Sequence, residues 1–242
     1  MQDDNTVIEL NAVTKSYGKN TVLNSINLKV KQGEFTVIRG KSGVGKSTLL
    51  KVLGFLETPD SGTVKLFGKD VTKLNDNQLS ELRLQNVGFV FQFFNLLPSL
   101  TIQENIELPL ALSGIKKPQR NERIAELLSY FQLEHLAERF PDNLSGGEKQ
   151  RIAIIRALAN NPKMIIADEP TSSIDDDNIE LLMTLLNKIA KNQGVTIVMT
   201  TTDLHEVYPS TSDYLLKDAQ LKQNLLHKIP IYHAKLPVEN TF

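Results

Sequence analysis

Residues 40–47 have the sequence Gly40-Lys41-Ser42-Gly43-Val44-Gly45-Lys46-Ser47, which matches the pattern G-x-x-x-x-G-K-[ST] of phosphate-binding loops. The apolar segment 35–38 before it predicts a buried strand, and the apolar residues of 49–53 after it predict a helix. A loop in that context directs backbone N–H groups and a helix N-terminus at phosphate oxygens. The alternative is an ordinary glycine-rich turn, which the flanking strand and helix disfavour. The stretch therefore predicts an α/β fold with a phosphate site.

The side chains at the end of the loop indicate the ligand. Lys46 is placed to neutralise the β and γ phosphates of a nucleoside triphosphate, and the Ser47 hydroxyl is placed to coordinate Mg²⁺. We therefore expect ATP and Mg²⁺ as cofactors. The expected nucleotide contacts in this loop are Gly40, Lys41, Ser42, Gly43, Val44, Gly45, Lys46, Ser47 and Thr48.

The amino-acid composition excludes several classes of protein. With 242 residues, 40% of them hydrophobic, the chain can bury a sizeable core. Its 27 Lys and Arg balance 28 Asp and Glu, so neither a nucleic acid nor an anionic membrane surface is expected as a direct partner. No direct insertion into a bilayer is expected. The absence of cysteine excludes disulfides and Cys-based zinc sites. No apolar stretch approaches the roughly 20 residues of a membrane span, and residues 1–6 are acidic and polar, unlike a signal peptide. The expected location is cytoplasmic.

Apolar patterning predicts the order of elements. Strand signals fill the first third of the chain, helical spacing runs through 101–160, and strands 164–167 and 195–199 flank a helix over about 176–191. Strand and helix alternating in this way predict a mainly parallel sheet. In the first third, the expected strands are 7–13, 28–30, 35–38, 62–67 and 87–91.

An acid pair follows the predicted strand 164–167. Carboxylates at the end of a parallel strand lie in the crevice where open α/β sheets bind ligands. Asp168 would hold Mg²⁺, and Glu169 would polarise the water that attacks the γ-phosphate. An acid pair alone is more often a solvated helix start, but its partnership with the phosphate loop favours the catalytic interpretation.

A third motif, at residues 145–148, is a second helix start that contains glycines. It therefore predicts a second anion site. Ser145 is expected at the N-cap and Glu148 three residues later, which forms a capping box; capping is compatible with presenting the same helix end to a nucleotide. The expected contacts with nucleotide are Ser145, Gly146, Gly147 and Glu148.

Together the three motifs resemble those of ATP-binding cassette (ABC) proteins, from about Val7 to Leu221. The resemblance implies a phosphate-loop NTPase core with a mixed, mainly parallel sheet, antiparallel N-terminal strands and an inserted α-helical subdomain. It places one nucleotide-binding domain at 1–221, the inserted subdomain at 92–160 and a C-terminal tail at 222–242. The tail is expected to be a docking segment or disordered.

The resemblance also implies partners and further site residues. In the family, the Ser145 motif of one subunit closes over ATP held by another, so a second copy and a membrane permease are the expected partners, at the cytoplasmic face of the inner membrane. Tyr17 matches the aromatic residue that stacks on adenine; alone, it could equally be a buried strand-end tyrosine. Gln92 matches the glutamine that contacts Mg²⁺ and the attacking water, and Asp175 matches an acid of the loop after Glu169.

The stretch that follows Gln92 resembles the lipoprotein-releasing and macrolide-exporter branch of the family, which implies lipoprotein, peptide or antibiotic-like cargo. We expect about half of its apolar residues to pack in the helical subdomain and the others to line a groove for a permease helix. These residues are Phe93, Phe94, Leu96 and Leu97.

One departure from the family pattern affects hydrolysis. Thr202 stands where the family has a histidine; its hydroxyl can hydrogen-bond a phosphate oxygen but cannot become cationic. We count Glu169, Gln92, Thr202 and Lys46 as the candidate catalytic residues. His205, expected on a following helix, is a weaker replacement. Because Glu169 is present, a working ATPase is favoured over a regulatory, hydrolysis-impaired clamp of the cell-division type.

Overall fold

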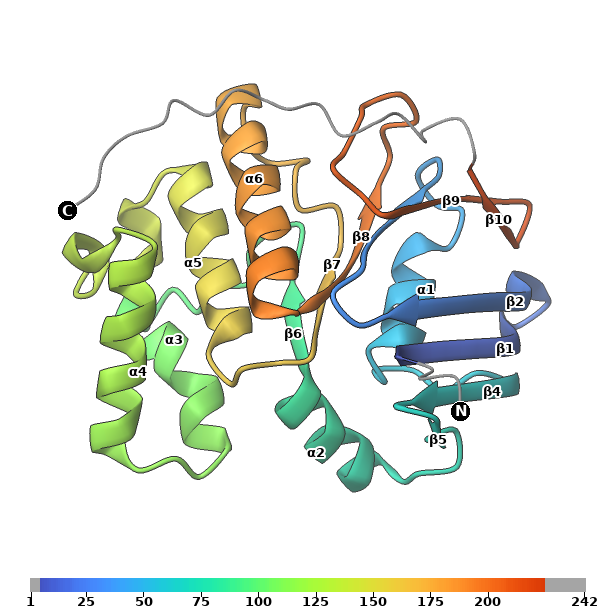
Figure 1. The fold of residues 1–242 in the computed structure, drawn as a ribbon, viewed down its shortest axis with the longest axis horizontal. Coiled ribbons are helices and arrows are strands. Elements are labelled where there is room, and N and C mark those ends of the chain that lie inside the picture. Colours follow the sequence, from blue (N-terminus) through green and yellow to red (C-terminus); the bar gives the residue numbers. More distant parts are fainter. Residues whose placement is uncertain (1–4, 225–242) are drawn as a thin grey trace.

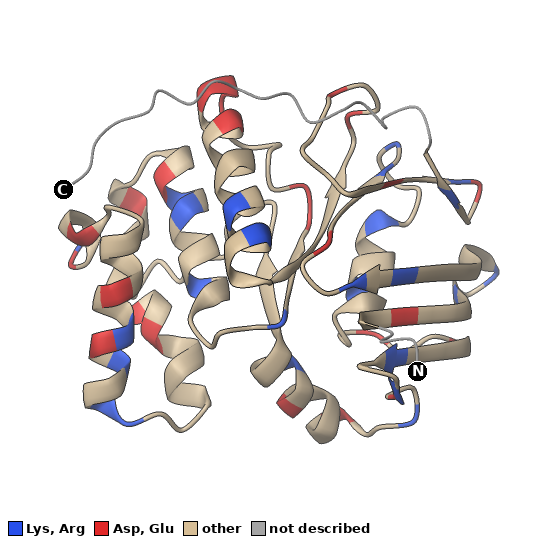
Figure 2. Ribbon diagram, viewed as in Figure 1, with Lys and Arg blue, Asp and Glu red and all other residues tan. Residues whose placement is uncertain are grey.

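The computed structural model describes residues 5–224. A group of helices, a six-stranded sheet and a four-stranded sheet follow one another across the molecule (Figure 1). Lys and Arg are interspersed with Asp and Glu over all three parts, as the balanced composition suggests (Figure 2). No helix among these residues is long and apolar enough to cross a membrane.

The smaller sheet is antiparallel and forms the N-terminal end of the fold. Its strand order is β2-β1-β4-β5. In β2, Ile26, Leu28 and Val30 are buried while the residues between them are exposed, the alternation of a sheet with one face in the core. Its strands are β1 (Thr6–Tyr17), β2 (Asn20–Lys31), β4 (Ser61–Leu66) and β5 (Lys69–Asp70).

The larger sheet carries the predicted phosphate loop and acid pair. Its order is β10-β9-β3-β8-β7-β6, and all neighbouring strands are parallel except β9 and β10. Every residue of β3, β7 and β8 is buried, because helices or the smaller sheet cover both faces. The strands are β3 (Phe35–Arg39), β6 (Val87–Val90), β7 (Met164–Ala167), β8 (Thr196–Thr201), β9 (Ser212–Lys217) and β10 (Gln220–Gln223).

Two hydrophobic cores lie on the two faces of this sheet. In β3, Val37 belongs to the core shared with the helical part, while Ile38 belongs to the core shared with the antiparallel sheet. Successive residues of a strand point to opposite faces, so the same strand supplies both cores. The strand ends are thereby held rigidly between two packed layers.

Six α-helices complete the described part of the chain. Three of them, α3 to α5, fall in the segment expected to be a helical insertion. The helix α2 was not predicted, although Asn75 and Gln78 form a capping box at its start. In α6, acidic residues lie in the first turn and Lys191 in the last, which suits the helix dipole (Figure 2). The helices are α1 (Lys46–Leu53), α2 (Asp76–Asn86), α3 (Ile102–Leu112), α4 (Lys117–Tyr130), α5 (Gly146–Leu158) and α6 (Asp176–Gln193).

Two expectations about the C-terminal part need correction. The prediction that His205 lies on a helix is wrong: 202–211 connects β8 to β9 without a helix. The Asp203 carboxylate instead accepts the N–H groups of His205 and Glu206, which closes a turn, and Pro209 disfavours continuation as a helix.

Strand β10 includes residues 222 and 223, so these belong to the sheet and not to the tail. The rest of the expected tail, 225–242, lies outside the described residues.

Candidate nucleotide site

The phosphate loop joins β3 to α1 at the carboxyl end of the larger sheet. Gly45 has φ 108°, a left-handed conformation open to glycine, and a Cβ there would lie 2.5 Å from the Val22 side chain. No side chain caps the N-terminus of α1. The first N–H groups of the helix can therefore serve a bound anion, as the sequence motif predicts.

Lys46 begins α1 and its side chain is only 4% exposed. Its ammonium group donates to the carbonyls of Gly40 at 2.9 Å and Lys41 at 3.0 Å, and lies 3.1 Å from Glu169 Oε1. A buried ammonium needs such partners, because burial of an unpaired charge is costly. The two residues predicted to act on the γ-phosphate are thus in contact.

A threonine of β8 orients the acid pair. Thr200 donates to Asp168 Oδ1 at 2.7 Å, and its hydroxyl oxygen accepts the N–H of Glu169 at 3.1 Å. Glu169 itself has φ 45°, which is uncommon for a residue with a side chain. Sequence reasoning missed Thr200, although a threonine in an otherwise apolar buried strand was a signal for a polar contact.

Gln92 and Thr202 follow the ends of two further strands of the same sheet. Gln92 lies just after β6, which pairs with β7, and its carbonyl accepts the Ser173 hydroxyl at 3.2 Å. Thr202 follows β8, and its side chain is exposed. Because β3, β8, β7 and β6 are consecutive neighbours, their carboxyl ends bring these residues to one edge of the sheet with Lys46.

Tyr17 ends β1 and is 47% exposed, so it is not a buried strand-end tyrosine. Its hydroxyl donates to Glu57, and Lys15 Nζ lies 5.7 Å from the ring centre. An exposed ring of this kind offers a face for stacking a planar base.

The glycine-flanked motif caps α5 as predicted. The Ser145 hydroxyl accepts the N–H of Glu148, and the Glu148 carboxylate accepts the N–H of Ser145, which lowers the pKa of Glu148. Among residues 5–224, no hydrogen bond or ion pair joins this motif to the phosphate loop. The structure does not bring the two anion sites of one chain together.

The start of α5 instead packs against α6. Asp175 caps α6 by accepting the N–H of Asn178 at 3.0 Å, which lowers the pKa of Asp175. A Cβ added to Gly147 would lie 2.3 Å from Asn178 Oδ1, so only glycine allows this approach. Arg151 also donates to Asn178 Oδ1, at 3.2 Å.

We expect Gly147→Ala to lower the free energy of unfolding by about 1–3 kcal/mol, because the added methyl group overpacks this contact. Urea unfolding of the isolated chain measures the effect. The same substitution in an Asn178→Ala background should cost less, since the obstructing amide is gone. An equal cost in both backgrounds would show that the contact with Asn178 is not the cause.

A phosphate loop that opens a helix after β3, together with an acid pair after β7 at the same edge of one parallel sheet, defines a phosphate-loop NTPase. A family model described as ABC transporter matches residues 23–172, more than half of the chain. The chain therefore belongs to the ABC transporter family, and it is an ATP-hydrolysing cassette of that family.

Known relatives agree in sequence and in structure. The lipoprotein-releasing system ATP-binding protein LolD of Bacteroides thetaiotaomicron is 44% identical over 81% of this chain and 90% of its own length. The methionine import ATP-binding protein MetN of Geobacillus kaustophilus is 42% identical over 83% of this chain and 60% of its own length. A dimeric, post-hydrolysis structure of the cassette MJ0796 of Methanocaldococcus jannaschii, bound to ADP and Pi, has a TM-score of 0.82 at 40% identity. It covers 90% of this chain and 97% of that one. These similarities confirm the predicted family and fold class.

Proposed function

We propose that this cassette drives a separate membrane permease, which it serves from the cytoplasmic face of the membrane as a pair of identical subunits. The observation that carries the proposal is the contact of Lys46 with Glu169 beside Asp168 and Thr200, at the edge of the sheet where the phosphate loop lies. This edge holds one cation for phosphate oxygens and one carboxylate for a water molecule.

In the proposed hydrolysis, the phosphates of ATP displace Glu169 from Lys46. Phosphate oxygens bound by the loop compete with Glu169 for the ammonium group, since both are anions within reach of one cation. Glu169, released from Lys46, can orient the attacking water and take its proton. Thr200 keeps the backbone of Glu169 in place, because it accepts the N–H of that residue. Gln92 and Thr202, which follow the ends of β6 and β8 in the same sheet, are proposed to act in the same step.

The donors at this edge fit Mg²⁺. The side chains expected to bind the ion each offer an oxygen ligand: the hydroxyl of Ser47, the amide oxygen of Gln92 and the carboxylate of Asp168. Within residues 5–224, no group of three or more His, Cys, Asp or Glu could hold a metal ion. Mg²⁺ is commonly held by one or two protein ligands together with phosphates and water, which suits this set. When bound, the ion would neutralise charge that develops on the phosphates.

The proposed dimer follows from the separation of the two anion sites. Among residues 5–224, no hydrogen bond or ion pair joins the Ser145 motif to the phosphate loop, so a second copy is proposed to bring a Ser145 motif to each nucleotide. The dimeric MJ0796 cassette supports this arrangement. Tyr17 is proposed to stack on adenine, and Asp175 to lie beside the nucleotide at the dimer interface.

The proposed cargo rests on the resemblance of the segment after Gln92 to the lipoprotein-releasing and macrolide-exporter branch and on the names of relatives. The name of one similar protein states lipoprotein release and that of another states methionine import, so likeness to the cassette does not select one cargo. We favour extraction or export of lipoprotein, peptide or antibiotic-like cargo, without a nucleic-acid partner. The domain proposed is 1–221, extended by residues 222 and 223 of β10, with 92–160 as the inserted subdomain; the proposed tail is the remainder of 222–242.

The segment after Gln92 supports a docking role. Phe93 is 74% exposed and Leu97 41% exposed, whereas Leu96 packs against the core of the helical part. Arg156 of α5 donates to the carbonyls of Phe94 and Asn95, two residues with positive φ. The segment is thus held on α5 while two large apolar side chains face outward, as a helix-in-groove contact requires.

We expect Phe93→Asp and Leu97→Asp each to reduce stimulation of ATPase activity by the co-expressed membrane partner at least about tenfold, because a charge would be buried in the contact. ATP binding by the isolated chain should stay within about twofold of the wild type. Leu181→Asp, at an exposed position of α6, is the matched control. Unfolding of the Leu97→Asp chain would instead assign Leu97 to the core, and normal stimulation of both variants would remove this segment from the interface.

A second candidate function is an ATP-gated clamp that signals through its membrane partner without transport. The observation that favours it is Thr202 at an exposed position, in a connection that lacks a helix. A clamp of this kind would bind ATP and dimerise but turn over slowly, so turnover by the purified wild-type chain separates the two candidates.

A further inference from the structure

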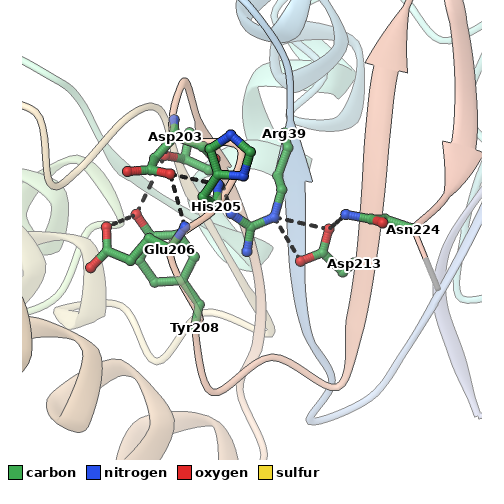
Figure 3. Close-up of polar contacts among 8 residues, drawn as sticks. Arg39, Asp203, His205, Glu206, Tyr208, Asp213 and Asn224 are labelled. Atoms are coloured by element: carbon green, nitrogen blue, oxygen red, sulfur yellow. Dashed lines mark hydrogen bonds and ion pairs between the residues drawn. The ribbon is translucent and has the colours of Figure 1, made fainter. Parts of the chain in front are cut away.

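Arg39 is a buried arginine at the end of β3, directly before the phosphate loop, and it is 1% exposed. Its Nε donates to both carboxylate oxygens of Asp213, at 3.1 and 2.8 Å, and its Nη1 donates to the carbonyl of Asp203 at 2.9 Å (Figure 3). The guanidinium carbon lies 5.1 Å from the centre of the Tyr208 ring. Asn224 also donates to Asp213, at 3.2 Å, and so helps to orient the carboxylate. One guanidinium therefore joins β3, β9 and the connection after β8.

That connection is folded by its own side chains around this guanidinium. The Asp203 carboxylate accepts the N–H groups of His205 at 2.7 Å and Glu206 at 2.8 Å, while the N–H of Asp203 donates to the Thr201 hydroxyl at 3.1 Å. The Tyr208 hydroxyl donates to Glu206 at 2.8 Å, and burial raises the pKa of Tyr208, which keeps the phenol protonated. In the absence of a helix, these contacts decide the path of the chain (Figure 3).

The network lies on both sides of Thr202. Before it, the Thr201 carbonyl accepts the N–H of Gly40, the first residue of the phosphate loop, at 3.2 Å. After it, the Asp203 carbonyl is held by Arg39, the residue that precedes Gly40. Arg39 and Gly40 are consecutive at the end of β3, and they thus hold the two residues on either side of Thr202.

We propose that Arg39, held by Asp213 and packed on Tyr208, is a positioning residue that sets the place of Thr202 relative to the phosphate loop for ATP hydrolysis. The inference rests on the role proposed above for Thr202. A planar guanidinium suits this task because it binds a carboxylate, a carbonyl and an aromatic face at once, which the point charge of lysine cannot do. A purely structural ion pair would affect folding but not the rate of hydrolysis by folded protein.

The first test replaces the ion pair by apolar side chains in the full chain, as Arg39→Met/Asp213→Ile. Such replacements often leave stability unchanged or improved, because no buried charge is left unpaired. We expect ATP affinity, measured by displacement of a fluorescent ATP analogue, to stay within about threefold of the wild type. The rate constant kcat should fall about tenfold to a hundredfold, the cost of misplacing a group near the reaction. An unchanged kcat in the folded double variant would overturn the proposal.

Two further variants keep the test decisive. Arg39→Lys retains the charge opposite Asp213, so it should fold, and we expect its kcat to lie between those of the wild type and the double variant. A wild-type kcat for Arg39→Lys, should the double variant fail to fold, would also overturn the proposal. Arg120→Met/Glu107→Leu removes another arginine–carboxylate pair, 2.7 Å apart between α3 and α4, and should leave kcat unchanged.

Thr202→Ala, in the same assay, separates this inference from the proposed function. If Thr202→Ala lowers kcat while the Arg39 variants do not, Thr202 acts in hydrolysis but Arg39 does not position it. If neither change lowers kcat, the role of Thr202 fails together with the inference.

Discussion

Replacement of Glu169 by Gln should lower ATP turnover by about two to four orders of magnitude while ATP binding is retained, which is the usual contribution of a general base. The substitution keeps the shape of the side chain and removes the carboxylate that can polarise water. The hydrogen bond from the N–H of residue 169 to the Thr200 hydroxyl does not involve the side chain of residue 169 and is preserved. Steady-state release of phosphate with Mg²⁺ and ATP measures the change.

Glu122→Gln, at an exposed position of α4, is the control for loss of one carboxylate and should leave turnover unchanged. If wild type and Glu169→Gln hydrolysed ATP equally, the role of Glu169 would be refuted. Thr202→His is measured in the same series. If the wild type did not hydrolyse ATP and Thr202→His did, the protein would be identified as the ATP-gated clamp.

Replacement of Lys46 by Met should weaken ATP binding about 30-fold or more, since loss of one partner of a buried charge pair typically costs 2–5 kcal/mol. The Lys46 side chain is 4% exposed and its ammonium group is held by two carbonyls and by Glu169, so its position is set before any phosphate binds. Methionine fills similar space and leaves the loop without its cation. Titration with a fluorescent ATP analogue measures the loss of affinity.

Lys51→Met is the matched control, because Lys51 lies on the same helix, is half exposed and pairs with Glu57 at 3.3 Å. Exposed ion pairs contribute little, so this variant should bind ATP as the wild type does. Equal affinities of Lys46→Met and wild type would exclude Lys46 from phosphate binding, whatever the stability of the variant.

The local motifs were predictable because each lies in one short stretch of chain. The phosphate loop needs glycines and a lysine at fixed spacing, and the capping box of Ser145 and Glu148 needs two residues three apart. Buried parallel strands were predicted from continuous apolar runs such as that of β7. The helix α2 was missed because its apolar pattern is weak, with Leu79 as its one buried residue.

The class of protein and the phosphate loop followed from the sequence, because local spacing and the alternation of strand and helix specify them. Tertiary structure alone decided which distant groups meet. Thr200 binds both acids only because β8 lies beside β7, and Arg39 reaches Asp213 only because β9 pairs with β3. Such contacts join residues far apart in the chain, and strand order, which local propensity does not encode, sets them.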